Sequence, residues 1–261
     1  NPHPLKQATL DGRKERREKA EQEWKDAVER GDMKTAHTKA QQTSRMTDEV
    51  KESAKELIRY MGLPIVDAPS DGEQEAAYIC RRKDVWATAS QDFDSLLFGT
   101  PVLLRNLTMT GRRKVPGKDI YREIKTEVID SEEFLRNLGI SREQLVDMCI
   151  LMGTDFNTGI KGIGPKKALK LVRDNGDLES VLRKIGEDIP DYQEIRGIFL
   201  DYEGSDDYSV EHGPLDRQAV VDMLTSYDFS ADRVNSALDR IESARKEEER
   251  KRKQKALDAW F

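Results

Sequence analysis

Residues 63–94 read LPIVDAPSDGEQEAAYICRRKDVWATASQDFD, and this stretch decides the fold class. Apolar runs at 63–66 and 85–89 are typical of buried strands, and the segment 73–83 between them has a helical composition. Two strands joined through a helix form a β-α-β unit, whose strands run parallel. We therefore expect an α/β protein with a mostly parallel central sheet flanked by helices.

Further strands are expected after this stretch, and a long helical region before it. Residues 102–107 and 127–129 are strand candidates on either side of a turn at 110–112, which indicates a hairpin. Residues 13–60 predict helix with a break at Gly31. The first half of that region has too few apolar residues for a core helix, so it protrudes or contacts a partner.

From Ser131 onward the pattern is helical. Ser141 and Gln144 form a capping-box pattern in front of residues 145–152. Those residues are apolar on nearly all sides, which predicts a buried helix.

Acidic residues follow the expected strands at the points where such sheets form sites. Glu73 and Glu75 begin the helix after the first strand, Asp92 and Asp94 follow the second, and Asp155 ends the apolar helix. Grouped carboxylates without His or Cys suit Mg²⁺ or Mn²⁺. A structural interpretation stays open, because Glu73 could offset a helix dipole and Asp92 could serve a turn.

A glycine-rich turn with the sequence GIKGIGPKK occupies residues 159–167. Gly162 and Gly164 allow positive φ and a close approach to a ligand, Pro165 suits the first residue of a helix, and Ile163 would anchor the turn. Free N–H groups at that helix start, beside Lys161, Lys166 and Lys167, would hold a phosphate. The alternative is an ordinary glycine turn; the lysines favour contact with a nucleic-acid backbone, read by shape and not by sequence.

Composition limits the classes that remain. The chain has 44 Lys and Arg against 50 Asp and Glu, but residues 161–185 carry 7 bases against 3 acids, so an acidic total does not exclude nucleic acid. No apolar run approaches the ~20 residues of a membrane span. Two cysteines indicate a reducing compartment, and three scattered histidines exclude a His-based zinc site of usual spacing.

The last eight residues, QKALDAWF, end a charged tail with two aromatic side chains. Gln254, Leu257, Trp260 and Phe261 fall on one side of a short helix. We expect them to dock into a partner's pocket. The alternative is that they fold back on their own domain.

Together these blocks resemble the flap endonuclease family, the XPG-type structure-specific nucleases with a PIN-like 5′-nuclease fold. The matching blocks are LPI through APS with Glu73 and Glu75, QDFD at 91–94, LLFG at 96–99, CILMGTD at 149–155 and GIGPK at 162–166. The resemblance implies hydrolysis of 5′-flap DNA, with 5′-3′ exonuclease activity, in replication and repair. It implies two Mg²⁺ or Mn²⁺ ions held by Glu73, Glu75, Asp92, Asp94 and Asp155.

The resemblance implies roles for other parts of the chain. Lys6 and Arg13 match the basic pair that steadies the scissile phosphate, and residues 14–45 match the helical arch passed by the free 5′ strand. The 159–167 turn matches a DNA-gripping hairpin with a monovalent cation such as K⁺. The C-terminal motif matches a sliding-clamp (PCNA) box.

The resemblance also gives a domain division and a cellular setting. It implies a nuclease core at 1–155 with an arch at about 6–60, a helix-hairpin (H2TH-like) DNA-binding region at 156–239 and a clamp-binding tail at 240–261. We expect a monomer, archaeal and cytoplasmic, or nuclear if the source is eukaryotic.

Two alternatives follow from the same comparison with the family. The family's first strands and two further metal-binding aspartates correspond to a segment before Asn1, which leaves open a non-catalytic DNA- and clamp-binding module. A bubble- or gap-cutting relative is disfavoured by the short insertion at 14–45.

Overall fold

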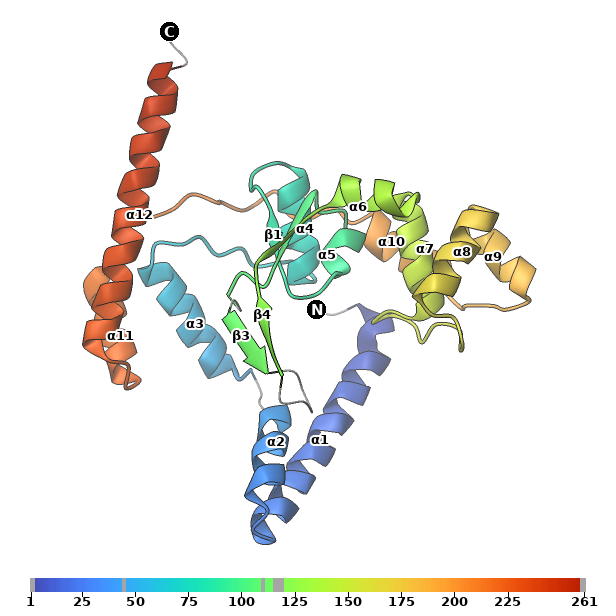
Figure 1. Ribbon diagram of the computed structural model, residues 1–261, viewed down its shortest axis with the longest axis horizontal. Helices are drawn as coiled ribbons and strands as arrows, with labels where there is room; N and C mark the ends of the chain where they lie inside the picture. The colour runs from blue at the N-terminus through green and yellow to red at the C-terminus, as the bar shows by residue number, and fades with distance from the viewer. Residues whose placement is uncertain (1–2, 44–45, 109–110, 115–119, 259–261) are drawn as a thin grey trace. The chain divides into compact units, whose positions relative to one another are not determined.

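The computed structural model describes residues 3–43, 46–108, 111–114 and 120–258. Its ribbon is coloured along the chain in Figure 1. The chain forms two compact units: residues 1–44 with 67–208, and residues 45–66 with 209–261. Each unit is described by itself. The functional division into 1–155, 156–239 and 240–261 is drawn on other grounds and stays a prediction.

The first unit contains a three-stranded sheet in the order β1-β2-β5. Strand β1 is Thr88–Ala89, β2 is Val102–Arg105 and β5 is Glu127–Asp130. β1 and β2 are parallel and joined through helix α5 (Asp94–Leu97), whereas β2 and β5 are antiparallel. The α/β class and the pairing of 102–107 with 127–129 are confirmed, in a sheet that is mixed.

A second pair of strands extends the hairpin between β2 and β5. Strands β3 (Gly111–Lys114) and β4 (Tyr121–Ile124) pair antiparallel. The strand predicted at 63–66 is wrong, because these residues have no regular structure. A strand exists only where a neighbour takes up its N–H and C=O groups, and a run of four apolar residues does not reveal whether that neighbour is present.

The first unit also contains helices that precede the sheet in the chain, connect its strands and follow it. After a short 3₁₀ turn (Pro4–Lys6) they are α1 Gln7–Glu29, α2 Met33–Thr43, α4 Gly72–Arg81, α5, α6 Ser131–Leu138, α7 Arg142–Met152, α8 Pro165–Asn175, α9 Leu178–Ile185 and α10 Tyr192–Leu200. The break at Gly31 is confirmed, and α1 and α2 run side by side (Figure 1). Ala20, Ala27 and Ala36 are the buried residues of this helical hairpin.

Helix α7 forms the centre of the core of this unit. Ser141 and Gln144 make the predicted capping box. Val146, Ile150 and Leu151 are fully buried, which confirms the buried helix. They pack in one cluster with Leu103 of β2, so the sheet and the carboxyl end of α7 are held in fixed relation.

The second unit packs three helices around a small apolar core. They are α3 Asp48–Tyr60, α11 Arg217–Ser226 and α12 Ala231–Asp258. Val220, Val234 and Leu238 form the buried centre. Gly62 has φ +65°, and a Cβ built there would lie 2.4 Å from the carbonyl oxygen of Gly213, so only glycine fits this close approach.

Two sequence-based expectations concern the whole chain. No helix in the described part is long and apolar enough to cross a membrane. Gln254 is exposed on α12, which also contains Leu257, whereas Trp260 and Phe261 lie outside the described residues. The clamp-binding motif therefore stays a prediction.

Candidate active site

One face of helix α1 and the turn before it contacts the loop after α7. Arg13 Nη2 donates to both carboxylate oxygens of Asp155, at 2.8 and 3.0 Å, and Thr9 Oγ1 donates to the Asp155 carbonyl at 2.8 Å. Lys6 Nζ lies 3.3 Å from Asp155 Oδ2. Residues at positions 6, 9 and 13 share a helical face, which is why one short segment delivers three donors to one aspartate.

Lys6 also joins the loop before α4 to this contact. Its Nζ lies 3.1 Å from Asp71 Oδ2, and Asp71 Oδ1 accepts the N–H of Glu73 at 2.9 Å as the cap of α4. Burial works to lower the pKa of Lys6, but the hydrogen bonds and charges of Asp71 and Asp155 outweigh it and raise the pKa. Lys6 is therefore a cation at neutral pH.

Ser90 connects the acidic groups that follow strand β1 and precede α4. Its hydroxyl donates to Glu73 Oε1 and accepts the N–H of Asp92 at 3.1 Å. Burial raises the pKa of Glu73; the Ser90 bond opposes the shift, and the carboxylates of Asp94 and Asp92 reinforce it. Burial likewise raises the pKa of Asp94, with repulsion from Asp155 and Asp92 adding to it. Electrostatic crowding of this kind is typical of catalytic sites.

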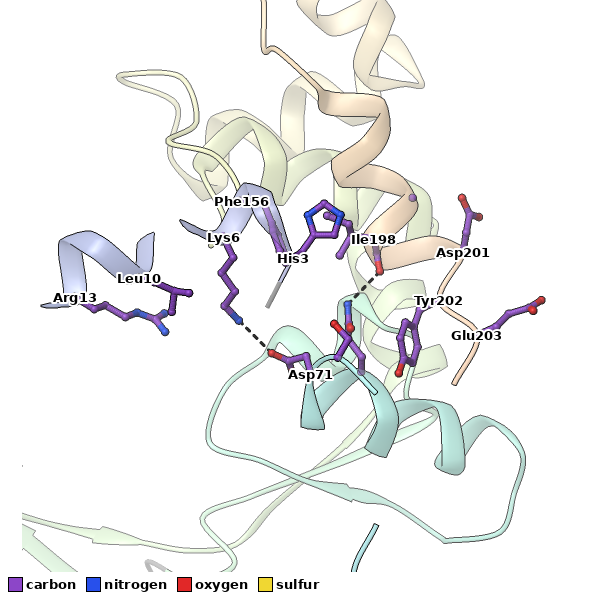
Figure 2. Close-up of a pocket in the computed structure, with 13 residues that line it drawn as sticks. His3, Lys6, Leu10, Arg13, Asp71, Phe156, Ile198, Asp201, Tyr202 and Glu203 are labelled. Carbon is purple, nitrogen blue, oxygen red and sulfur yellow. Dashed lines mark hydrogen bonds and ion pairs between the residues drawn. The ribbon is translucent and has the colours of Figure 1, made fainter. Parts of the chain in front are cut away.

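These groups line a cavity of about 550 Å³. Glu73, Asp92, Asp94 and Asp155 all face it, together with Asp71, Lys6 and Arg13. A neighbouring hollow of about 620 Å³ shares Lys6, Arg13 and Asp71 and continues toward the end of α10 at Ile198 and Asp201. Figure 2 shows Lys6 reaching across this hollow to Asp71.

Glu75 lies apart from the other predicted acids. It is buried, and its carboxylate accepts the Tyr202 hydroxyl at 2.7 Å and the N–H of Ser205 at 3.2 Å. The structure thus brings together four of the five predicted acids and gives Glu75 two partners from the segment after α10. Its predicted metal role stays a prediction.

The donor set fits a hard divalent cation. Four carboxylates with mutual repulsion face one cavity, and burial raises the pKa of the adjacent Cys149 thiol to about 11, so no thiolate competes there at neutral pH. Among the described residues no three His, Cys, Asp or Glu side chains already converge as a ready-made metal group. Lys6 and Arg13 instead neutralise Asp155.

The glycine turn presents exposed lysines on an anchored backbone. Ile163 is buried, Gly162 has φ +82° and α8 begins at Pro165, as predicted. Gly164 has φ −104°, so it does not adopt the positive φ that a glycine allows. Lys161, Lys166 and Lys167 are exposed, and none of them forms an ion pair within the described ranges.

The loop that contains Asp155 is held because its backbone packs closely against the end of α7. Ile160 N donates to the carbonyl of Leu151 at 2.8 Å, and Asn157 Nδ2 donates to that of Ile150 at 2.8 Å. Gly159 has φ +68°, and a Cβ there would lie 2.3 Å from Gly153 N and from the carbonyl carbon of Met152. The loop therefore returns against the end of α7 and fixes where Asp155 emerges.

Three site residues were not predicted from the sequence. Asp71 was not among the predicted acids, although it stands two positions before Glu73 in the same acidic segment. Ser90 and Thr9 act through hydroxyl groups. Because these groups are uncharged, the charge pattern of the sequence does not reveal them. Their roles become visible only when strand, loop and helix are placed together.

The comparisons place this site within a known class of nucleases. Residues 62–155 match the family described as the XPG I-region. A solved flap endonuclease-1 from Methanococcus jannaschii superposes with a TM-score of 0.66 at 38% identity, over 82% of this chain and 63% of that one. The catalytic core of Rad2 in complex with DNA superposes with a TM-score of 0.61 at 21% identity, over 77% of this chain and 72% of that one, which shows a shared fold. The fold is that of the XPG-type 5′ nucleases.

Similar proteins of known name then identify the family within this class of nucleases. Proteins named flap endonuclease 1 from Thermofilum pendens and Pyrococcus abyssi are each 46% identical to this chain, over 100% of this chain and 75% of theirs. The chain belongs to the flap endonuclease family, as the sequence motifs predicted. Members of this family are structure-specific hydrolytic nucleases.

Proposed function

We propose that this chain carries the nuclease site of a flap endonuclease, which hydrolyses a DNA phosphodiester near the junction of a 5′ flap and its duplex. The observation that carries the proposal is the meeting of two cations from one helical face, Lys6 and Arg13, with the carboxylates at the ends of β1 and α7. Such a pairing of fixed positive charge with grouped acids suits a phosphate that is bound and cut.

The acids would hold the divalent ions of the reaction. Glu73, Asp92, Asp94 and Asp155 line one cavity, and Glu75 joins them in the assignment carried over from the family. When bound, two Mg²⁺ or Mn²⁺ ions supply an activated water and stabilise the leaving oxygen. Burial raises the pKa values of Glu73 and Asp94, and the neighbouring carboxylates add to both shifts. This supports the assignment, because a bound cation would relieve the repulsion between the carboxylates.

Lys6 and Arg13 would orient the scissile phosphate. Arg13 Nη2 donates to both oxygens of the Asp155 carboxylate, and a phosphate offers the same paired oxygens to that guanidinium. Arg13 is half exposed, so its guanidinium is accessible to an incoming phosphate. If Arg13 exchanged its partner Asp155 for a phosphate, the Asp155 carboxylate would become available to a cation.

Binding of the duplex would use the glycine turn and α8. The exposed lysines beside Gly162 and the N-terminus of α8 favour contact with a phosphate backbone, and K⁺ would bind backbone carbonyls there. The arch of α1 and α2 would pass the 5′ strand. The sliding clamp would bind through Gln254, Leu257, Trp260 and Phe261, with the nuclease acting as a monomer.

The decisive experiment is cleavage of a labelled double-flap DNA by the 261-residue chain, with Mg²⁺ and with EDTA. We expect metal-dependent cutting that Asp155→Asn lowers by at least about 100-fold and that the exposed control Asp188→Asn leaves unchanged. DNA binding in EDTA is measured in parallel. Binding without any metal-dependent cutting by the unsubstituted chain would overturn the proposal in favour of a DNA-binding module.

A further inference from the structure

Arg105 lies where strand β1 leaves the sheet. Ser90 N donates to the carbonyl of Leu104 at 3.1 Å, which extends the β1–β2 ladder by one bond. One residue further along the departing chain, the carbonyl of Gln91 accepts from Arg105 Nε at 3.2 Å and from Nη2 at 3.1 Å. The guanidinium therefore supplies the donors that the sheet no longer provides.

The same guanidinium is fixed from two other directions. Its Nη1 donates to Glu127 Oε2 at 2.9 Å, and Arg105 and Glu127 are direct partners in the β2–β5 register. Its central carbon lies 4.0 Å from the centroid of the Phe93 ring. Arg105 thus contacts the chain at Gln91 and at Phe93, on both sides of Asp92.

The segment held in this way has little packing of its own. Residues 91–94 each leave a large part of their surface open to solvent, although the carboxyl group of Asp94 lines the site cavity; residues 95–98, which follow, are buried. The main-chain bonds of the segment include Asp92 N to Ser90 Oγ at 3.1 Å and Leu96 N to the carbonyl of Phe93 at 2.9 Å. Asp92 and Asp94 line the same cavity as Glu73 and Asp155, so groups of like charge lie close to this segment.

We propose that Arg105 is a positioning residue, which holds the 91–94 segment so that Asp92 and Asp94 stay beside Glu73 and Asp155. The inference rests on the proposed function, since it assigns these two acids to the nuclease site. A lysine keeps the charge but lacks the planar fork that grips one carbonyl with two N–H groups and lies on a ring. Geometry, and not charge alone, is therefore what Arg105 contributes.

The test compares Arg105→Gln and Arg105→Lys, each in the complete chain, with the unsubstituted chain. The matched control is Arg136→Gln, since Arg136 also pairs with a glutamate but lies on α6. Amide hydrogen exchange reports the order of residues 91–95, and a Mn²⁺ titration reports the carboxylate group without needing cleavage. We expect faster exchange in the segment and Mn²⁺ binding weaker by about tenfold or more in both Arg105 variants, with the control unchanged.

Glu127→Gln provides a gentler second variant. It keeps the guanidinium but removes the charge that orients it, so we expect a smaller effect in the same direction. Circular dichroism verifies that each variant is folded. DNA affinity in EDTA should stay within about twofold of the unsubstituted chain, because a positioning role acts through the acids.

Three results would overturn the proposal. Unchanged amide hydrogen exchange and unchanged Mn²⁺ affinity in Arg105→Gln would show that the 91–94 segment is ordered without Arg105. Full function in Arg105→Lys would show that charge suffices. Weaker DNA binding in EDTA with an unchanged segment would make Arg105 a DNA contact instead. If the unsubstituted chain neither binds Mn²⁺ nor cuts DNA, the proposed function fails, while the exchange measurement still decides whether Arg105 orders the segment.

Discussion

Arg13 and Asp155 are 142 positions apart in the chain, yet the guanidinium of one donates two hydrogen bonds to the carboxylate of the other. The pair joins the first helix of the chain to the end of the buried helix α7. It also holds an acid of the proposed metal site against a cation of the proposed phosphate site. Substrate and metal would each compete for one half of this pair.

Removal of Arg13 should therefore affect catalysis more than folding. We expect Arg13→Ala to slow single-turnover cleavage by about 100-fold, because a fixed charge facing the phosphate is lost. The free energy of unfolding should fall by less than about 1 kcal/mol, since the arginine is half exposed. Arg183→Ala, which removes an exposed arginine of α9 paired with Glu179, should change neither quantity. Equal losses of cleavage in both variants would contradict the assignment.

Divalent-cation binding should strengthen as pH rises. The pKa values of Glu73 and Asp94 are raised, so both groups hold protons at pH values where an ordinary carboxyl group has lost them. A cation must displace those protons, and its affinity rises until the pH exceeds the raised pKa values. Mn²⁺ titrations from about pH 4 to 8 measure this slope. Asp94→Asn should make it shallower, and an equal slope in that variant would remove Asp94 from the site.

The same shifts predict a stability effect with the opposite dependence on pH. A raised folded-state pKa means that the folded protein binds more protons than the unfolded chain between the two pKa values. Without a cation, the free energy of unfolding should thus fall as pH rises through this window. With saturating Mg²⁺ the loss should disappear. Thermal unfolding in EDTA and in Mg²⁺ measures both, and a Mg²⁺-independent profile would count against a metal site here.

Gly159 should tolerate no side chain. A Cβ there would lie 2.3 Å from backbone atoms, and φ is +68°, so we expect Gly159→Ala to lower the free energy of unfolding by at least about 2 kcal/mol. Gly12→Ala is the matched control, because Gly12 lies within α1 with open space around it. That substitution should be neutral or stabilise by up to about 1 kcal/mol. Urea unfolding distinguishes the two, and similar values would refute the close approach.

The stability of the protein should depend on the ion pair between the buried Asp147 and Arg196. Asp147 is 1% exposed and accepts Arg196 Nε at 2.5 Å and the N–H of Leu178 at 3.2 Å. Burial raises the pKa of Asp147, against the lowering effect of Arg196. Arg196→Leu should destabilise the protein by about 3 kcal/mol at neutral pH, because the carboxylate loses its partner. The penalty should shrink as pH falls and Asp147 becomes protonated; urea unfolding at two pH values tests this.

Local patterns in the sequence located the candidate acids, and the family resemblance supplied their proposed roles. Asp92 and Asp94 were located by the end of a strand, and Asp155 by the end of an apolar helix, because each position follows from the element before it. The shared face of Lys6 and Arg13 follows from helical spacing alone. The capping box at Ser141 and the buried helix after it are likewise local features.

Features that depend on distant partners were missed or misjudged. The sequence around Glu75 did not reveal that Tyr202 and Ser205, 127 and 130 positions later, donate hydrogen bonds to its carboxylate; the metal role of Glu75 stays a prediction. The apolar run at 63–66 looked like a strand, but strand formation requires a neighbour that composition does not show. The role of Asp71 was missed because it depends on Lys6, 65 positions earlier in the chain.

The alanines between α1 and α2 have a consequence for selectivity. Ala20, Ala27 and Ala36 bury only methyl groups, so the hairpin gains little from the hydrophobic effect compared with the Ile- and Leu-rich core around α7. It should open locally at a lower free energy than that core. A nucleic acid that binds along the hairpin would then have to restrict its conformational freedom. Only a substrate that makes enough contacts there would offset this loss of entropy. The low local stability of the hairpin would thus favour such substrates over those that make fewer contacts.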